Sequence, residues 1–462
     1  MISKATSVAM ALLILALVPL SAEEGLGYDE LVGSMVSLNT ELRKADQAVV
    51  QSGLDVKNAK AQYSPAIDLT VSGTYMPNPP IGRITMSVEE LQGQLGTAIP
   101  GAGAGEYVTL YDGMGNFMFN AGVSITQPLF TWGKIPESVD LYKAIADIRA
   151  IDRSDKEERL SSELSARLCA MRYMEEMLIL LDEASGLADE LLSISEDAYE
   201  SGMILREDLA EARLGKMELD VSRKEIEGEA SKNMQAIGSI TGLEGIESSD
   251  IIFEVDEAYI DAVSEMDEEE LFRSAFRGDS ASLRMLSKQT EALMKKKEIA
   301  DDSVYWKPDF ALQVSASYGG EYLPFAEKNW YRGDDYGLYV TLAMKTTLWD
   351  GGKALNNIKS AESEITASYA DYDAAVDMLQ QSARESITAM KLSKARIEYL
   401  ELKKETAQSR LDILRMQLEE GWSSRMDILK KEMEIKEYEI GIMKERISLS
   451  QAVYTLSYLS GI

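Results

Sequence analysis

Residues able to carry catalysis are scarce in this sequence. It contains no histidine and a single cysteine, Cys169. Without histidine, Ser-His-Asp and Cys-His sites are excluded and the commonest zinc ligand is missing. One cysteine alone can form neither a disulfide framework nor a thiolate metal cluster. The sequence therefore predicts a protein that is not an enzyme, with no catalytic residues, no metal site and no cofactor.

Two weaker patterns do not change this prediction. The glycine-rich run 101–105 lacks the Lys-Ser/Thr pair of a phosphate-binding loop and opens no helix, so a surface loop is the better interpretation. Pairs of acids such as Glu175-Glu176 and Glu419-Glu420 are most simply solvated helix faces. Any energy for a transport process would have to come from a partner.

The composition restricts the class of protein. The formal net charge is −31, which disfavours nucleic acid and anionic membrane surfaces as partners. Such a charge would attract cationic solutes or basic partners, or it could simply keep the chain soluble. Charged residues make up 27% of the chain, which excludes a polytopic helical membrane protein.

The N-terminus resembles a secretory signal peptide. Lys4 precedes an apolar run over 9–20, which at about 12 residues is too short to span a bilayer as a helix. Cleavage after Ala22 would remove residues 1–22; the alternative is an uncleaved membrane anchor. Because no other long apolar run follows, the mature chain could enter a membrane only as β-structure.

An internal repeat organises the rest of the chain. Leu129-Phe130-Thr131-Trp132-Gly133-Lys134 resembles Leu348-Trp349-Asp350-Gly351-Gly352-Lys353, and Gly202, Asp208 and Gly242 match Gly421, Asp427 and Gly461 at the same spacing. The span 129–243 therefore recurs as 348–462. Upstream, 63–67 matches 306–310 at a longer spacing. The additional residues of the first half must fall within 76–116, opposite the shorter 319–335, and both stretches are predicted to be loops.

Each repeat contains two runs of strict alternation between apolar and polar residues, at 67–75, 117–126, 310–318 and 336–345. Period-two patterning predicts β-strands with one apolar face. Each run is about 9–10 residues long, as in transmembrane β-strands, and has aromatic residues near its ends. The alternative is a soluble, half-buried sheet.

The remaining sequence is predicted to be helical. Long helices are expected over 134–201 and 353–420, each roughly 100 Å long at 1.5 Å per residue. Shorter helices are expected over 36–64, 203–241, 283–305 and 422–460. Since no globular core is that long, such helices should pack as a coiled coil or helical barrel. The predicted organisation is a signal peptide (1–22), a first repeat (23–243), an acidic linking segment (244–270) and a second repeat (271–462).

The motif at the end of the second strand supports a family resemblance. Gln127-Pro128-Leu129-Phe130-Thr131-Trp132-Gly133-Lys134 resembles the strand-to-helix junction of TolC-type outer-membrane efflux proteins, commonly QPLFxxGK, and 348–353 resembles its second copy. The resemblance covers about residues 28–462. It implies that Pro128, Gly133 and Gly352 form the two junctions.

The resemblance also implies a fold and a function. The fold class would be an α+β membrane protein: a long α-helical barrel continuous with a transmembrane β-barrel, to which each chain of a trimer gives four strands. Physics requires closure of the barrel, but would also permit a dimer or tetramer. The acidic segment would lie around the outside of the helical tunnel. The protein would be the outer-membrane duct of a tripartite efflux or type I secretion system.

Its expected partners are outer-membrane lipid, a periplasmic adaptor (membrane fusion protein) and an inner-membrane pump, and its cargo would be small molecules or proteins. Two alternatives remain: a structural, envelope-spanning coiled-coil protein, and a periplasmic adaptor. Neither needs strands of lipid-spanning length.

The two glycine turns are the predicted docking site for the adaptor, at the periplasmic tip. Both turns share Gly, Arg, Asp and an aliphatic residue at the same spacing: Gly202, Arg206, Asp208 and Leu209, then Gly421, Arg425, Asp427 and Ile428. The alternative is ordinary hairpin chemistry, with glycine ending a helix.

By resemblance, Asp427 would line the pore constriction as a ring of carboxylates, which would attract cations. A second acid found one turn later in the family is Lys430 here. The alternative role for Asp427 is local, because Ser424 and Asp427 have the spacing of a capping box. Asp208 could likewise cap its helix, or pair with Arg425.

Overall fold

The structure is a computed structural model, and it describes residues 25–98, 100, 101, 103, 105–274, 280–304, 306–320 and 336–460. The predicted signal peptide and residues 321–335 of the second loop lie outside the described residues. The chain divides into two compact units: Met1–Ser52, Ile145–Thr290 and Ala367–Ile462 form unit 1, and Gly53–Ala144 and Glu291–Thr366 form unit 2. Each unit takes segments from both predicted repeats, because the long helices of each repeat belong partly to one unit and partly to the other.

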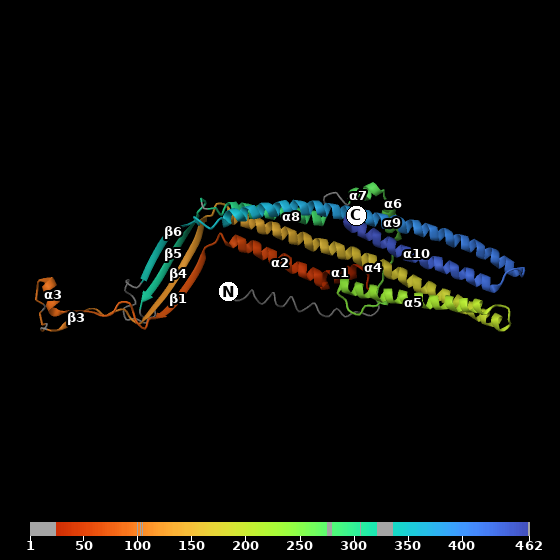
Figure 1. The fold of residues 1–462 in the computed structure, drawn as a ribbon, viewed down its shortest axis with the longest axis horizontal. Coiled ribbons are helices and arrows are strands. Elements are labelled where there is room, and N and C mark those ends of the chain that lie inside the picture. Colours follow the sequence, from red (N-terminus) through yellow and green to blue (C-terminus); the bar gives the residue numbers. More distant parts are fainter. Residues whose placement is uncertain are drawn as a thin grey trace. The chain divides into compact units, whose positions relative to one another are not determined.

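Unit 2 contains an antiparallel four-stranded sheet (Figure 1). Its strands, in spatial order, are β1 (Ala66–Tyr75), β4 (Phe117–Phe130), β5 (Asp309–Gly320) and β6 (Tyr336–Lys345). The predicted strand 117–126 continues to Phe130, because Gln127, Pro128 and Phe130 find partners in the first residues of β5. The other predicted strands agree within two residues at each end.

The register of the sheet gathers the apolar residues onto one face. Directly paired residues include Leu69 with Val123, Val123 with Ala316, and Ala316 with Leu338. Since neighbours across strands point to the same side, one apolar face runs across all four strands. It is uncovered within the chain: Leu69 is 71% exposed and Leu338 is 74% exposed.

The two ends of the sheet differ. Ala66 lies opposite Thr126 and Asp309 lies opposite Lys345, so all four connections to helices leave from one end. The other end carries both long loops.

The first of these loops is more ordered than predicted. Within 76–116, β2 (Ile84–Ser87) pairs with β3 (Tyr107–Tyr111), and helix α3 (Val88–Leu95) lies between them. The helix begins with a capping box, in which Ser87 Oγ accepts a hydrogen bond from the Glu90 amide at 3.3 Å. The prediction of a plain loop was therefore wrong, because it weighed the Gly and Pro content and overlooked this Ser-x-x-Glu signal.

The helices begin and end close to where the glycines predicted. Helices α4 (Lys134–Glu200) and α9 (Lys353–Glu419) have 67 residues each. The returning helices α5 (Arg206–Thr241) and α10 (Arg425–Ser460) have 36 residues each. Each returning helix starts three residues later than predicted, because the residues after the glycine form a turn. Helix α8 (Ala281–Asp301) also ends earlier than expected. Within the described residues, no helix is long and apolar enough to cross a membrane.

The predicted helix 36–64 is two helices, α1 (Tyr28–Leu38) and α2 (Thr40–Ala61). Asn39 separates them. Its side-chain oxygen accepts hydrogen bonds from the amides of Glu41 (2.8 Å) and Leu42 (3.1 Å), while its amide donates to the Ile240 carbonyl (2.8 Å). An asparagine side chain that bonds to backbone groups competes with helical hydrogen bonding, so a continuous helix was the wrong prediction here.

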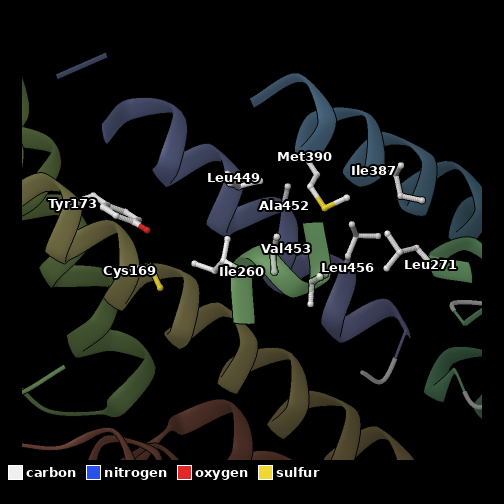
Figure 2. Close-up of a cluster of buried hydrophobic side chains, with 11 residues drawn as sticks. Cys169, Tyr173, Ile260, Leu271, Ile387, Met390, Leu449, Ala452, Val453 and Leu456 are labelled. Atoms are coloured by element: carbon white, nitrogen blue, oxygen red, sulfur yellow. The ribbon is translucent and has the colours of Figure 1, made fainter. Parts of the chain in front are cut away.

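The acidic segment between the repeats is part of the core of unit 1. It contains the 3₁₀ turn η1 (Ser248–Asp250), α6 (Glu257–Glu265) and α7 (Glu268–Ser274). Figure 2 shows Ile260 of α6 and Leu271 of α7 in one buried cluster with Cys169 of α4 and Met390 of α9. Burial raises the pKa of the Cys169 thiol to about 11, which identifies it as an unreactive packing residue.

Candidate functional site

The junction between β4 and α4 is built around a bulge in the sheet. Pro128 lies opposite Ala311 and Phe130 lies opposite Phe310, which leaves Leu129 as the extra residue. Proline has no amide hydrogen to give to the ladder and is tolerated in a sheet at such irregular places. The bulge therefore explains why a proline can stand near the end of this strand.

The backbone then turns sharply into the helix. Trp132 and Gly133 both have positive φ, of 57° and 102°. The Trp132 indole donates to the Pro308 carbonyl at 2.9 Å, and Lys134 Nζ lies 2.8 Å from an Asp309 carboxylate oxygen. A Cβ on Gly133 would lie 2.8 Å from Asp302 Oδ2. Gly133 is thus required both by its φ and by the close approach of Asp302.

The second junction makes the same turn with different contacts. Gly351 and Gly352 have φ of 70° and 88°. The Asp350 carboxylate accepts hydrogen bonds from the amides of Gly352 (2.9 Å) and Ala354 (2.7 Å), and so caps α9. Sequence reasoning had named the glycines of the two junctions but had assigned no role to Trp132 or Asp350, although an aspartate just before a helix is a recognised capping signal.

Gly133→Ala is expected to destabilise unit 2 more than Gly352→Ala does. Both substitutions force alanine into a positive φ, a strain of about 1–3 kcal/mol, but a Cβ at Gly352 meets no atom within 4 Å. The difference between the two variants isolates the clash with Asp302. The midpoints of denaturant unfolding, followed by tryptophan fluorescence in this unit, measure this difference in stability. Equal midpoints for the two variants would show that the Asp302 side chain moves aside freely.

The two glycine turns share one backbone design. After α4, the Gly202 amide donates to the Tyr199 carbonyl at 2.9 Å and the next amide donates to the Ala198 carbonyl at 2.8 Å. After α9, the equivalent bonds, from Gly421 and from the residue after it, measure 3.0 and 2.8 Å. With φ of 71° and 75° at the glycines, both turns are Schellman motifs.

The starts of the returning helices differ. Ser424 and Asp427 form a reciprocal capping box: the Ser424 hydroxyl and amide donate to the Asp427 carboxylate at 2.6 and 3.1 Å, and the Asp427 amide donates to Ser424 Oγ at 3.1 Å. The Ser424 hydrogen bonds lower the pKa of Asp427. In the first repeat the N-cap is Leu205, whose amide donates to Asp208 Oδ2 at 2.9 Å.

The two arginines of the turns also differ. Arg425 forms a two-pronged ion pair with Glu190 of α4, at 2.8 and 3.0 Å. The alternative pairing of Arg425 with Asp208 is therefore not found within the chain. Arg206 is exposed and makes no ion pair with any described residue. Hence the shared Gly-x-x-x-Arg spacing does not give the two arginines the same local environment.

The aliphatic members of the predicted docking set are internal. Leu209 is 7% exposed and Ile428 is 2% exposed. Ile428 packs with Ala407 and Leu411 of α9. These two residues hold the helical hairpins together and present little surface to a partner.

Asp427 gives the start of α10 a defined pH dependence. Because its pKa is lowered in the folded protein, the stabilisation is fully present above the unfolded pKa of about 3.9 and is lost as pH falls through the folded value. Amide exchange in the first turn of α10, corrected for intrinsic rates, should quicken about fivefold below pH 3, corresponding to the lower part of the 0.5–2 kcal/mol range for exposed caps. In Asp427→Asn the same turn should show no such change. Persistence of the pH step in that variant would assign it to another group.

In the described part of the chain, no group of three or more His, Cys, Asp or Glu side chains could hold a metal ion. The positions that sequence and structure single out are thus turns, caps and exposed surfaces.

Comparison with known proteins agrees with this architecture. Residues 277–461 match the family described as outer membrane efflux protein. No curated protein matches the sequence. Among solved structures, the outer-membrane channel OprN superimposes with a TM-score of 0.71 at 14% identity, over 94% of this chain and 89% of that one.

Two further channels show the same likeness. The Campylobacter jejuni CmeC outer membrane channel has a TM-score of 0.71 at 13% identity, over 94% of this chain and 85% of that one. The outer membrane protein VceC from Vibrio cholerae has a TM-score of 0.70 at 14% identity, over 94% and 96%. At these identities the likeness establishes the fold. Residues 277–461 thus match the outer membrane efflux protein family in sequence, and nearly the whole chain has the fold of these outer-membrane channels.

Proposed function

We propose that this chain is one protomer of a trimeric outer-membrane duct that exports small molecules or proteins. The observation that carries the proposal is the apolar face of the sheet, which crosses all four strands and is uncovered by the chain itself. A soluble protein rarely leaves so much contiguous apolar surface in water. Outer-membrane lipid is the natural cover for strands of this length.

Closure of the sheet supports an oligomer. Its edge strands, β1 and β6, run in opposite directions, because the antiparallel sheet has an even number of strands, four. Copies joined edge to edge therefore continue the antiparallel pattern without interruption. Unpaired strand edges are not tolerated in lipid, so the sheet must close into a barrel shared by several chains. Three chains, as the resemblance implies, give twelve strands.

The helices of unit 1 offer matching surfaces for neighbouring copies. On α5, Leu214, Met217 and Val221 form a stripe with three- and four-residue spacing and are 59%, 62% and 54% exposed. On α9, Tyr399 and Leu402 continue such a stripe and are 57% and 63% exposed. Apolar stripes with this spacing are seams of coiled coils. In the assembled trimer they would pack side by side into the wall of a periplasmic helical tunnel.

In this arrangement the two long loops lie outside the cell and the glycine turns lie at the periplasmic end. The turns would meet a periplasmic adaptor, which connects the duct to an inner-membrane pump that supplies the energy. Asp427 lies in the first turn of α10, where a threefold axis would bring three copies near the constriction. Its capping bonds with Ser424 are compatible with that placement.

The test is the behaviour of the purified, membrane-extracted protein. We expect a heat-modifiable trimer on gels and stepwise conductance in planar bilayers. A soluble monomer without conductance would favour the alternatives, an envelope-spanning coiled coil or an adaptor.

A further inference from the structure

A cavity of about 730 Å³ lies within unit 1, where residues of α1, α4 and α10 meet. Eight of the eleven described residues that line it are serines or tyrosines, and Val32 is the one aliphatic residue among them. Its volume falls in the range of about 300–1,000 Å³ that small-molecule sites occupy. Because protein interiors contain few voids larger than a water molecule, a cavity of this size beside a buried core needs a physical reason.

Serines of α4 keep this cavity open. Ser161 and Ser165 are one helical turn apart, and the leucines beside them, Leu160, Leu164 and Leu168, belong to the buried core that α4 shares with α1. A larger apolar side chain at position 161 or 165 would extend this core into the cavity. Serine instead leaves the space and lines it with hydroxyl groups. Polar residues at positions of a core are a mark of a functional site.

The hydroxyl groups of the cavity are held in place by hydrogen bonds. Tyr28 Oη lies 3.1 Å from Ser161 Oγ and 3.0 Å from Ser165 Oγ. The Tyr458 hydroxyl donates to the Asp155 carboxylate at 2.8 Å. A hydroxyl oxygen that has donated its hydrogen still has lone pairs with which it accepts hydrogen bonds. Since these side chains are ordered before a ligand arrives, binding costs little additional conformational entropy.

The tyrosines of the cavity also supply aromatic rings. Tyr28 comes from α1, Tyr454 and Tyr458 come from α10, and all three are half-buried. A tyrosine combines an apolar ring with one polar atom at its edge. A pyranose sugar has the complementary character, with C–H groups on its ring faces and hydroxyl groups around its rim. A fatty chain would leave the hydroxyls of the cavity without partners, so the lining favours a sugar.

The charged residues of this cavity are acids. Glu157 forms an ion pair with Arg153. Glu158 accepts a hydrogen bond from the Ser154 hydroxyl at 3.2 Å and has no ion-pair partner among the described residues. The described lining contains neither lysine nor arginine. An anionic ligand would therefore be repelled, whereas a neutral sugar or an amino sugar would not.

A neighbouring cavity of about 480 Å³ shares Tyr454 with the first, and it is lined by two arginines. Both arginines already pair with acids, Arg159 with Glu41 and Arg167 with Glu163, each at 2.8 Å. Neither arginine therefore offers an unpaired positive charge to an acidic ligand.

We propose that the cavity between α1, α4 and α10 binds a soluble saccharide of one or two pyranose rings that carries no negative charge. The tyrosine rings pack against the faces of the sugar, and the hydroxyls of Tyr28, Ser161 and Ser165 bond to its rim. Glu158 accepts a hydrogen bond from the amino group where the sugar carries one. Because the cavity lies within unit 1 of a single chain, the proposal does not depend on the trimeric duct.

Three disaccharides serve as probes of the purified protein, kept in a detergent whose headgroup is not a sugar. Cellobiose is neutral, the disaccharide of glucosamine is cationic, and the disaccharide of galacturonic acid is anionic. Ligand-observed NMR titrations measure the affinities. We expect saturable binding of the first two and about tenfold weaker binding of the acid, because the carboxylates of Glu157 and Glu158 repel it. No saturable binding of any probe, or equal affinity for all three, overturns the proposal.

Ser161→Leu tests whether the sugar occupies the cavity. The leucine side chain fills space that the sugar needs, so the affinity for cellobiose should fall about tenfold, as for the loss of a central contact. The midpoint of thermal unfolding should stay the same or rise, because an apolar side chain fills the void. Unchanged affinity for cellobiose in Ser161→Leu would place the sugar elsewhere and overturn the proposal.

Glu158→Gln gives an independent test at an exposed position, where the substitution does not disturb folding. It should weaken binding of the glucosamine disaccharide about threefold and strengthen binding of the galacturonic acid disaccharide by a similar factor, as expected for an exposed charge. Glu200→Gln, at an exposed position of the same helix outside the cavity lining, is the control and should change neither affinity. Equal effects of the two substitutions would assign the charge preference to the whole chain and contradict the site.

Conductance in planar bilayers separates this proposal from the proposed duct. Ser161→Leu and Glu158→Gln should conduct as the unmodified protein does, while their sugar affinities change. Absence of conductance in the unmodified protein would count against the duct and leave the result for the sugar site standing.

Discussion

Val340→Arg is expected to prevent stable assembly of the protein in the outer membrane, whereas Thr341→Arg is expected to leave it intact. Val340 lies in the middle of β6, pairs with Val314 on the apolar face and is 69% exposed. Arginine at mid-membrane depth on the lipid face of a barrel costs about 2–4 kcal/mol. In the proposed trimer the penalty is incurred three times.

Thr341 is the matched control because it is the next residue along the same strand. It pairs with Gln313, so its side chain points to the polar face, where charges are tolerated in barrels of this kind. The amount of heat-modifiable trimer in outer-membrane fractions measures both variants. If the two arginines had equal effects, the sheet would not have one lipid-facing side.

Charge reversal at Arg425 is expected to raise the conductance of the proposed trimeric duct, and additional charge reversal at Glu190 is expected to return the conductance to its original value. The two side chains form an ion pair across α10 and α4, with a second carboxylate, Glu432, 4.0 Å from Arg425. An exposed pair shifts an equilibrium only a few-fold. Three symmetric copies compound such a shift to roughly thirtyfold, which is enough to change the population of a closed state.

The pKa directions agree with a formed pair, since Arg425 lowers the pKa of Glu190 and Glu190 raises that of Arg425. Arg206→Glu in the first repeat is the control, because Arg206 makes no ion pair with the described residues. Single-channel recording of Arg425→Glu, Glu190→Arg and the double variant completes the cycle. A double variant that conducts as much as Arg425→Glu alone would contradict a role for the pair in holding the turns together.

The two predictions concern different links between structure and function. The prediction for Val340 and Thr341 depends on the alternation of apolar and polar residues along β6, and it tests which face of the sheet meets lipid. The prediction for Arg425 depends on its ion pair with Glu190, a residue 235 positions away in the sequence. It tests whether this pair holds the helical hairpins together within a chain. A protein could satisfy either one alone.

Structural elements whose cause is local were predictable from the amino-acid sequence. Strict alternation fixed the strands and their apolar face, because side chains on a strand alternate between its two sides. A long stretch without glycine or proline predicted α9, the internal repeat predicted α4 at the equivalent place, and Gly202 and Gly421 predicted their ends. Glycine readily adopts the left-handed conformation of a helix end. The junction glycines, Gly133 and Gly352, were predicted from the family resemblance of the strand-to-helix motif.

Features that depend on residues distant in the sequence became visible in the folded chain. Asn39 divides α1 from α2 through a bond to Ile240, and the acidic segment enters the core because α10 offers it an apolar face. Arg206 and Arg425 have the same local spacing, yet only Arg425 finds an acid, Glu190, beside it. A spacing rule records neighbours along the chain, whereas an ion pair or a buried contact is selected by which helices pack together.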